Sequence, residues 1–329
     1  MAIAAPNVLE RIRATVQEMP GRGSDRKVGF TAMGTWCEIT LNTSSRSAAD
    51  HFLREAVEWV AAFESKYSRF LPDSLISRIN QAAGKDWVST DPETDQLLGL
   101  CNELFFLTRR AFDPTSLPLI RLWDWKAKPP VVPTDQAIEA AKQVVGWNKI
   151  QRRPGGLFLP RTGMCLDLGG VGKEYAVDRV VQLALDNGIS NALVNFGQDV
   201  RAVGTAPGLP AWHVGLEDPK KPGSCWGGVA AINVAVATSG DYLRGFELKG
   251  RRYGHIIDPR SGYPVDNGCR AVTVIAPSCT VAGILSTTAF ILGAQEGLDL
   301  ISSYIGAAGC ILTDHKRYET RTFAEYLTR

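Results

Sequence analysis

The chain has 329 residues, of which 45% are hydrophobic and 21% are charged, and its formal net charge is +2. This composition is typical of a globular protein, and so small a net charge gives no electrostatic field that favours nucleic acid or an anionic membrane. No apolar run is long enough to span a bilayer, and the first residues lack a secretory pattern or an early lipoprotein-type cysteine. We therefore expect a cytoplasmic protein with no nucleic-acid partner and no membrane insertion.

The cysteines and histidines exclude two further classes of site. The seven cysteines are odd in number and scattered, they contain no Cys-x-x-Cys pair, and only four histidines are present. This pattern argues against a zinc site and against a disulfide framework, and it favours reduced thiols.

The first 27 residues predict a separate extension, with a helix from about Val8 to Glu18 followed by a linker rich in Gly, Arg and Ser. We place the main domain at residues 28–329. Phe30–Leu41 alternates apolar and polar residues as one strand, and Gly34 inside it suggests a bulge.

Apolar spacing and capping residues predict the remaining elements. Helices are expected at Ala48–Tyr67, from a cap at Asp73 or Ser74 to Asn80, and at Asp91–Thr108, Asp135–Val145, Cys279–Leu292 and Ala294–Tyr304. Two strands are expected within Ile150–Leu166, and others at Asn191–Phe196, Ala211–Gly215, Gly228–Ala237, Arg252–Asp258, Ala271–Ala276 and Gly309–Thr313.

The stretch Leu166–Asp178 predicts a short apolar strand, a glycine turn and a helix that stops at Asn187-Gly188. Glycines let a backbone approach a ligand closely, and the start of a helix attracts anions through its free N–H groups. Lys173 adds a full positive charge, so phosphate is a plausible ligand. Glu174 stands where a P-loop needs Ser or Thr, which excludes a Walker-type site. The glycines by themselves are equally compatible with a tight turn that binds nothing.

Several motifs together resemble the ApbE-type flavin transferase family (FAD:protein FMN transferases). In order they are AMGT at Ala32–Thr35, FLPDSLISRIN at Phe70–Asn80, AFDPT at Ala111–Thr115, LDLGGVGKEYAVD at Leu166–Asp178, NFGQD at Asn195–Asp199, ATSGDY at Ala237–Tyr242, GHIIDPRSGYPV at Gly254–Val265 and VTVIAP at Val272–Pro277. The resemblance implies an enzyme that binds FAD and Mg²⁺, moves FMN to a Ser or Thr hydroxyl of an acceptor protein and releases AMP.

The resemblance also implies roles for individual residues. His255 matches a position that aids proton transfer, and an imidazole suits that role because its pKa lies near neutrality. Gly170, through its carbonyl, and Thr287 match metal-binding positions. Positions that line FAD are matched by Met33, Phe70, Ala111, Phe112, Asp113, Asp167, Lys173 and Ile257.

This chain departs from the family at one metal-binding position. The family offers an Asp one helical turn before the Thr, and here that position is Gly283. Mg²⁺ prefers one or two carboxylates together with phosphate oxygens. We therefore expect slow transfer or none. A Gly283→Asp chain should tolerate the change, unless another group already fills the space, and should gain Mg²⁺ dependence. Two smaller departures are Glu174 and Gln198, where glycines are usual.

The expected fold is α+β, with mixed, largely antiparallel sheets flanked by helices and a smaller α/β part. The leading function is Mg²⁺-dependent FMN transfer from FAD to a protein. Two alternatives stay open: an FAD pyrophosphate hydrolase that gives FMN and AMP, and a flavin-binding protein that has lost metal-dependent transfer.

Overall fold

The computed structural model describes residues 6–21 and 25–328. Within these ranges one sheet of nine strands runs in the order β1-β2-β3-β7-β8-β11-β14-β15-β16, and each of its pairings is antiparallel. The strands are β1 (Gln17–Met19), β2 (Arg26–Ala32), β3 (Thr35–Asn42), β7 (Asn191–Phe196), β8 (Asp199–Val203), β11 (Ala235–Gly240), β14 (Cys269–Ala276), β15 (Ala308–Thr313) and β16 (Arg317–Glu319).

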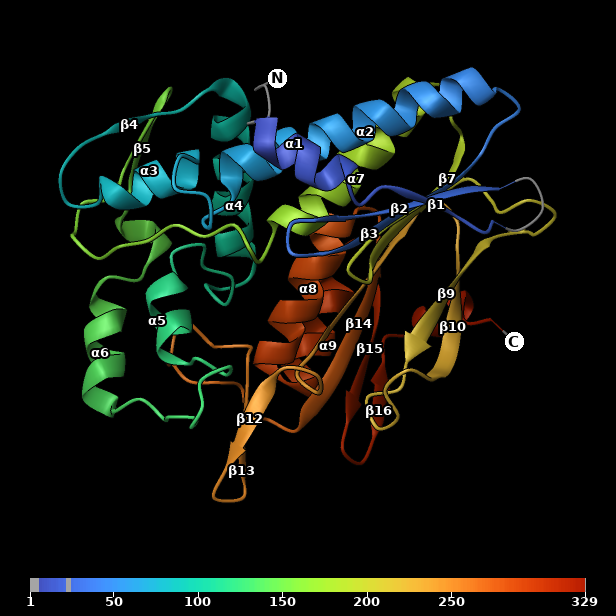
Figure 1. Cartoon of the computed structure of the whole chain (residues 1–329). Coiled ribbons are helices and arrows are strands. Elements are labelled where there is room, and N and C mark those ends of the chain that lie inside the picture. The colour runs from blue at the N-terminus through green and yellow to red at the C-terminus, as the bar shows by residue number, and fades with distance from the viewer. Residues whose placement is uncertain (1–5, 22–24, 329) are drawn as a thin grey trace.

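The two faces of this sheet carry separate cores, because successive side chains of a strand point to opposite faces. Helices cover one face, and Val194 on β7 packs there in the main core. Leu193, its neighbour in the chain, faces the other side, against the hairpin β9–β10 and the short helix η2 (Figure 1). The helices and the hairpin are α2 (Arg46–Tyr67), α7 (Gly172–Asp186), α8 (Cys279–Leu292), α9 (Ala294–Ser303), β9 (Trp212–Glu217), β10 (Cys225–Ala231) and η2 (Phe323–Tyr326).

A smaller part lies beside the sheet, at the left of Figure 1. Its elements are α3 (Leu75–Gln81), α4 (Pro92–Leu107), α5 (Leu117–Leu122), α6 (Asp135–Gln143), η1 (Trp147–Lys149) and the three-stranded sheet of β4 (Val88–Ser89), β6 (Gly156–Phe158) and β5 (Gln151–Arg153). The hairpin β12 (Gly245–Leu248) and β13 (Arg251–Gly254) packs against α5 and α6 through Trp123 and Tyr253. The expected α+β class is confirmed, although the described sheets are antiparallel rather than mixed.

The capping residues set the starts of the predicted helices correctly. Ser74 accepts a hydrogen bond from the Ser77 N–H at the start of α3, and Asp91 does the same for the Thr94 N–H at the start of α4. Such caps satisfy N–H groups that have no partner within the helix. No helix in the described part of the chain is long and apolar enough to cross a membrane.

The prediction of one strand at Phe30–Leu41 is wrong. Strands β2 and β3 form a hairpin whose two turn residues, Met33 and Gly34, have φ angles of 51° and 72°. Two residues with positive φ make the turn whose twist matches paired antiparallel strands. The alternating pattern continued through this turn, so the pattern did not reveal the reversal.

Three other predicted strands differ from the structure. Residues 166–168 belong to no strand. The stretch predicted at Gly228–Ala237 covers the end of β10 and the start of β11, which are separated by a turn at Asn233 with φ of 52°. Strand β13 ends at Gly254, before the predicted end at Asp258. In each case a local turn or a side-chain contact replaces the ladder that an apolar run suggested.

The N-terminal helix α1 (Pro6–Arg13) is shorter than predicted, and residues 17–19 form strand β1 instead. Val8 and Ile12 are buried in the main core, and β1 pairs with β2. Part of the expected linker, residues 22–24, lies outside the described residues. The domain boundary at residue 28 stays a prediction.

Candidate active site

The glycine turn ends in an open helix start. Gly169 and Gly170 are exposed, and α7 begins at Gly172. Val171 occupies the capping position, and no side chain in the described ranges caps this helix. An uncapped helix start carries N–H groups and a partial positive charge that attract anions. Lys173, in the first turn, adds to that attraction.

The segment before the turn is held by the smaller part of the molecule. The Asn80 side chain on α3 binds both the N–H group and the carbonyl of Leu166, at 2.6 and 2.9 Å, as a neighbouring strand would. The Asp167 carboxylate pairs with Arg69 at 3.2 Å and accepts the Gly169 N–H at 3.1 Å. These contacts fix the turn without a sheet ladder, and they orient Asp167 toward it.

Aromatic side chains flank the turn. The Phe112 ring lies 3.6 Å from the position that a Cβ on Gly170 would occupy, so the ring is in van der Waals range of the turn. Phe70 is 77% exposed and stacks under the Arg69 guanidinium, 4.1 Å from its ring centre. An exposed aromatic beside a glycine turn can stack on a planar ligand.

Asp113 and Ile257 are also predicted to line FAD. In the structure the Asp113 side chain makes hydrogen bonds and the Ile257 side chain packs in an apolar cluster. The Asp113 carboxylate accepts hydrogen bonds from the Thr115 N–H, the Thr115 hydroxyl and the Trp147 N–H. Burial raises the pKa of Asp113, while these bonds oppose the rise. Ile257 is buried in the cluster around Trp123, and Ala111 is buried in the main core.

Met33 contributes through its backbone. Its N–H donates to the Glu64 carboxylate at 2.9 Å, and Glu64 also pairs with Arg11 of α1. The turn between β2 and β3 is therefore anchored on α2, on the same face of the sheet as α7.

Lys173 lies between two carboxylates. It contacts Asp199, at the start of β8, and its Nζ is 3.5 Å from Glu174 Oε1. Asp199 follows the turn residue Gln198, whose φ is 75°, a backbone conformation that favours glycine. Asp199 and Glu174 are both buried. With Lys173 they form a small cluster of one basic and two acidic side chains.

Helix α8 brings hydroxyl groups to the same region. Ser239 on β11 is 2.8 Å from both the Ser286 and the Thr287 hydroxyls. Ser286 is buried, and Thr287 is half-buried. Hydroxyl residues are not favoured in the middle of a helix, and here their hydrogen-bond partner is this strand.

Asp178 aligns α7 with α8, a role that the sequence did not predict. Its carboxylate accepts the N–H groups of Cys279 and Thr280 and the Thr280 hydroxyl, and it pairs with Arg201 at 2.8 Å. Asp178 therefore caps α8 from a different helix. In the sequence, the only sign of this cap is an acidic residue on α7, about a hundred positions before the helix that it caps.

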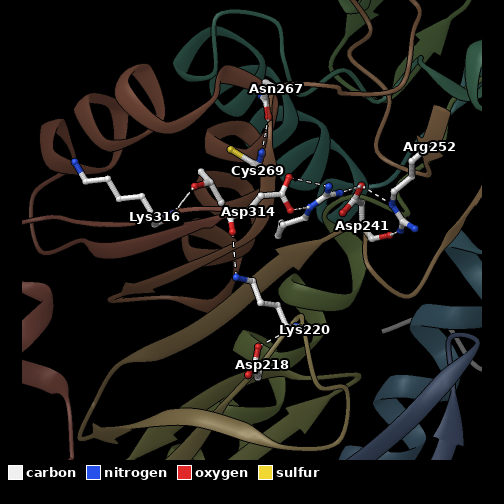
Figure 2. Close-up of polar contacts among 10 residues, drawn as sticks. Asp218, Lys220, Asp241, Arg252, Asn267, Cys269, Asp314 and Lys316 are labelled. Carbon is white, nitrogen blue, oxygen red and sulfur yellow. Dashed lines mark hydrogen bonds and ion pairs between the residues drawn. The ribbon is translucent and has the colours of Figure 1, made fainter. Parts of the chain in front are cut away.

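His255 directly follows β13, and its backbone N–H donates to the Arg244 carbonyl at 3.2 Å. Arg252 on β13 and Arg270 on β14 both contact the buried Asp241. Figure 2 shows Asp241 beside Arg252. Arg270 also pairs with Asp314 at 2.7 Å. His255 Nδ1 is buried with no hydrogen-bond partner in the described part of the chain. Burial lowers the pKa of His255, and Arg244 lowers it further, so the imidazole is neutral near pH 7.

A separate cavity of about 330 Å³ lies under the β9–β10 hairpin. Its lining includes His213, Glu217 and Tyr242, and the Tyr242 hydroxyl donates to Glu217 at 2.7 Å. Burial and the neighbouring Glu217 raise the pKa of Tyr242. This cavity lies on the opposite sheet face from α7 and α8, so it is separate from the glycine turn and its neighbours.

Residues 33–312 match the profile of the ApbE family, which is most of the chain. The chain belongs to the ApbE family. This protein is 31% identical over 269 residues to the FAD:protein FMN transferase of Vibrio cholerae, with 80% of each chain covered. It is 30% identical over 304 residues to the enzyme of the same name from Treponema pallidum, with 87% of this chain and 83% of the relative covered.

A solved structure agrees with this assignment. The ApbE protein of Thermotoga maritima superposes with a TM-score of 0.80 at 30% identity, over 95% of this chain and 100% of the other. The match spans both the main sheet and the smaller part. This chain and the Thermotoga maritima protein therefore share the same overall fold.

Proposed function

We propose that this ApbE-family protein transfers FMN from FAD to a Ser or Thr hydroxyl of an acceptor protein, with Mg²⁺, and releases AMP. The uncapped start of α7 behind two exposed glycines, with Lys173 in its first turn, carries the proposal. Such a site suits a pyrophosphate, because N–H groups and a lysine offset its charge. The names of the Vibrio and Treponema relatives support the same reaction.

The residues proposed to line FAD are those around this turn and its neighbours. Lys173 and the turn backbone would hold the pyrophosphate, and Phe112 and Phe70 would contact flat ring systems. The full proposed set is Met33, Phe70, Ala111, Phe112, Asp113, Asp167, Lys173 and Ile257. Asp113 and Ile257 would act by shaping the wall, since their side chains are already engaged.

The reaction needs a proton acceptor. A bond forms between the acceptor's hydroxyl oxygen and the phosphorus of the FMN half, the bond to the bridging oxygen breaks, and AMP leaves with that oxygen. His255 would take the hydroxyl proton, because its lowered pKa keeps the imidazole neutral. Bound Mg²⁺ would neutralise charge on the pyrophosphate, and the Thr287 hydroxyl with the Gly170 carbonyl would hold it.

We also propose a cytoplasmic location. The seven cysteines lie within the described ranges and carry no disulfide there, and six of them are buried. Reduced, buried thiols are usual in a reducing compartment. Fractionation of cells that express the full chain tests this proposal, and recovery in a secreted fraction would contradict it.

The test of function measures two products. The purified protein is incubated with FAD, Mg²⁺ and an acceptor protein that carries a Ser/Thr site, and AMP and FMN-modified acceptor are followed together. We expect equal amounts of both. AMP with free FMN and unmodified acceptor would identify a hydrolase. FAD binding with no AMP would identify a flavin-binding protein, and either result would overturn the proposal.

A further inference from the structure

The side chain of Glu174 occupies the space beside Gly283. Glu174 projects from the first turn of α7 and is 9% exposed. A Cβ on Gly283 would lie 2.6 Å from Glu174 Cγ and 3.3 Å from Glu174 Oε1. A side chain at position 283 and the present Glu174 side chain therefore exclude each other. Glu174 is therefore the group that already fills the space, which is the condition under which Gly283→Asp is not tolerated.

The carboxylate of Glu174 is incompletely satisfied. Its Oε1 is 3.5 Å from Lys173 Nζ, which also contacts Asp199. Its Oε2 is buried and has no hydrogen-bond partner among residues 6–21 and 25–328. A buried carboxylate oxygen is unfavourable unless a donor or a cation meets it. One lysine facing two carboxylates leaves an excess of negative charge that a cation can offset.

The way α7 packs against α8 places this oxygen at the interface of the two helices, one turn from the proposed metal ligands Gly170 and Thr287. Asp178 contacts Cys279 and Thr280, and one turn back along α7 Glu174 contacts Gly283. The helices therefore run antiparallel along this interface. One more turn leads to Gly170, just before α7, and to Thr287 on α8.

We propose that Glu174 supplies the carboxylate ligand of the divalent cation, in place of the acidic residue that the family carries at position 283. A glycine and a carboxylate have exchanged places between α7 and α8. The carboxylate oxygens therefore enter the space between the two helices from α7 and not from α8. The exchange accounts for two departures at once, the acidic residue at 174 and the glycine at 283. The inference rests on the proposed function for the identity of Gly170 and Thr287 as neighbouring ligands.

The same oxygen types suit Mg²⁺. A carboxylate, a hydroxyl and a carbonyl are hard ligands, and water or phosphate oxygens complete its coordination. The described residues contain no group of three or more His, Cys, Asp or Glu placed to hold a metal. A site with one carboxylate, completed by hydroxyl, carbonyl and phosphate oxygens, agrees with this finding.

The test measures cation binding without turnover. Mn²⁺ is titrated into the full chain without flavin, and the free ion is followed by its paramagnetic resonance signal. Glu174→Gln keeps the shape and removes the charge, so we expect binding weakened by more than about tenfold, since even groups that only orient a ligand contribute 10–100-fold. Asp186→Asn, at the far end of α7, is the matched control and should bind as the wild type does.

The exchange variant decides between a ligand and a merely structural carboxylate. Glu174→Gly combined with Gly283→Asp moves the carboxylate back to α8 and removes the overlap, so binding should recover to within a few-fold of the wild type. Thermal unfolding of each variant confirms that it is folded. Wild-type affinity in Glu174→Gln, no recovery in the folded double variant, or no Mn²⁺ binding by the wild type would overturn the inference. Glu174-dependent binding without FMN transfer would instead refute only the proposed function.

Discussion

Replacing Asp178 should destabilise the protein more than removing an ordinary helix cap. Asp178 accepts two backbone N–H groups and one hydroxyl at the start of α8 and pairs with Arg201. Its side chain is 14% exposed, so these contacts are poorly screened by water. Hydrogen bonds to charged groups contribute about 1.5–3 kcal/mol each but are not additive, and truncating one partner of a buried charged pair costs about 3–5 kcal/mol. We expect a loss of about 3 kcal/mol for Asp178→Ala.

Thermal unfolding measures this loss. An unfolding entropy of about 2.1 cal/mol/K per residue gives about 0.7 kcal/mol/K for the whole chain, so 3 kcal/mol lowers Tm by about 4 °C. Ser278→Ala is the matched control, because Ser278 caps the same helix through one bond to the Val281 N–H at 3.3 Å. That change should cost about 1 kcal/mol. Equal losses for the two variants would refute the view that Asp178 holds α7 and α8 together.

The remaining predictions concern the candidate site. Lys173→Ala should weaken binding of FAD more than that of riboflavin, because riboflavin has no phosphate for the lysine to meet; fluorescence titration measures both, and equal weakening would assign Lys173 to folding. Gly283→Asp alone should lower the free energy of unfolding by about 1–3 kcal/mol, since its Cβ would overlap Glu174, and an unchanged urea midpoint would contradict the packing. His255 has a pKa below its ordinary 6.5, so the decline of kcat/KM on the acidic side should have its midpoint below pH 6.5. His255→Gln should abolish that decline. Because the unfolded state binds this proton more readily, His255 should also reduce stability as pH falls from 6.5 toward its folded pKa, a loss absent from His255→Gln.

The sequence determined most helices and the order of the motifs. Helix starts were readable because Ser74 and Asp91 cap their own helices, so the signal lies within a few residues of the chain. The glycine turn and the start of α7 could also be predicted, because their signal lies within a few neighbouring residues. The α+β class followed from the resemblance of these motifs to the ApbE family.

The strands were predicted less well, because their boundaries depend on partners far away in the chain. Residues 166–168 have a strand-like pattern, yet the Asn80 side chain takes the place of a strand partner. The turn at Met33 and Gly34 reverses the chain within an unbroken alternating pattern. The positions of FAD-lining residues remain predictions, and the structure already assigns the Asp113 carboxylate to local hydrogen bonds.

Only the tertiary structure showed that Glu174 and Gly283, which the resemblance marks as two separate departures, lie in contact. In the sequence, Glu174 and Gly283 are over a hundred positions apart, and each is an isolated change. Asp178, one turn from Glu174, caps α8 and thereby sets the register in which Glu174 lies against Gly283. That contact depends on the packing of two helices, which neither local propensity nor motif spacing specifies.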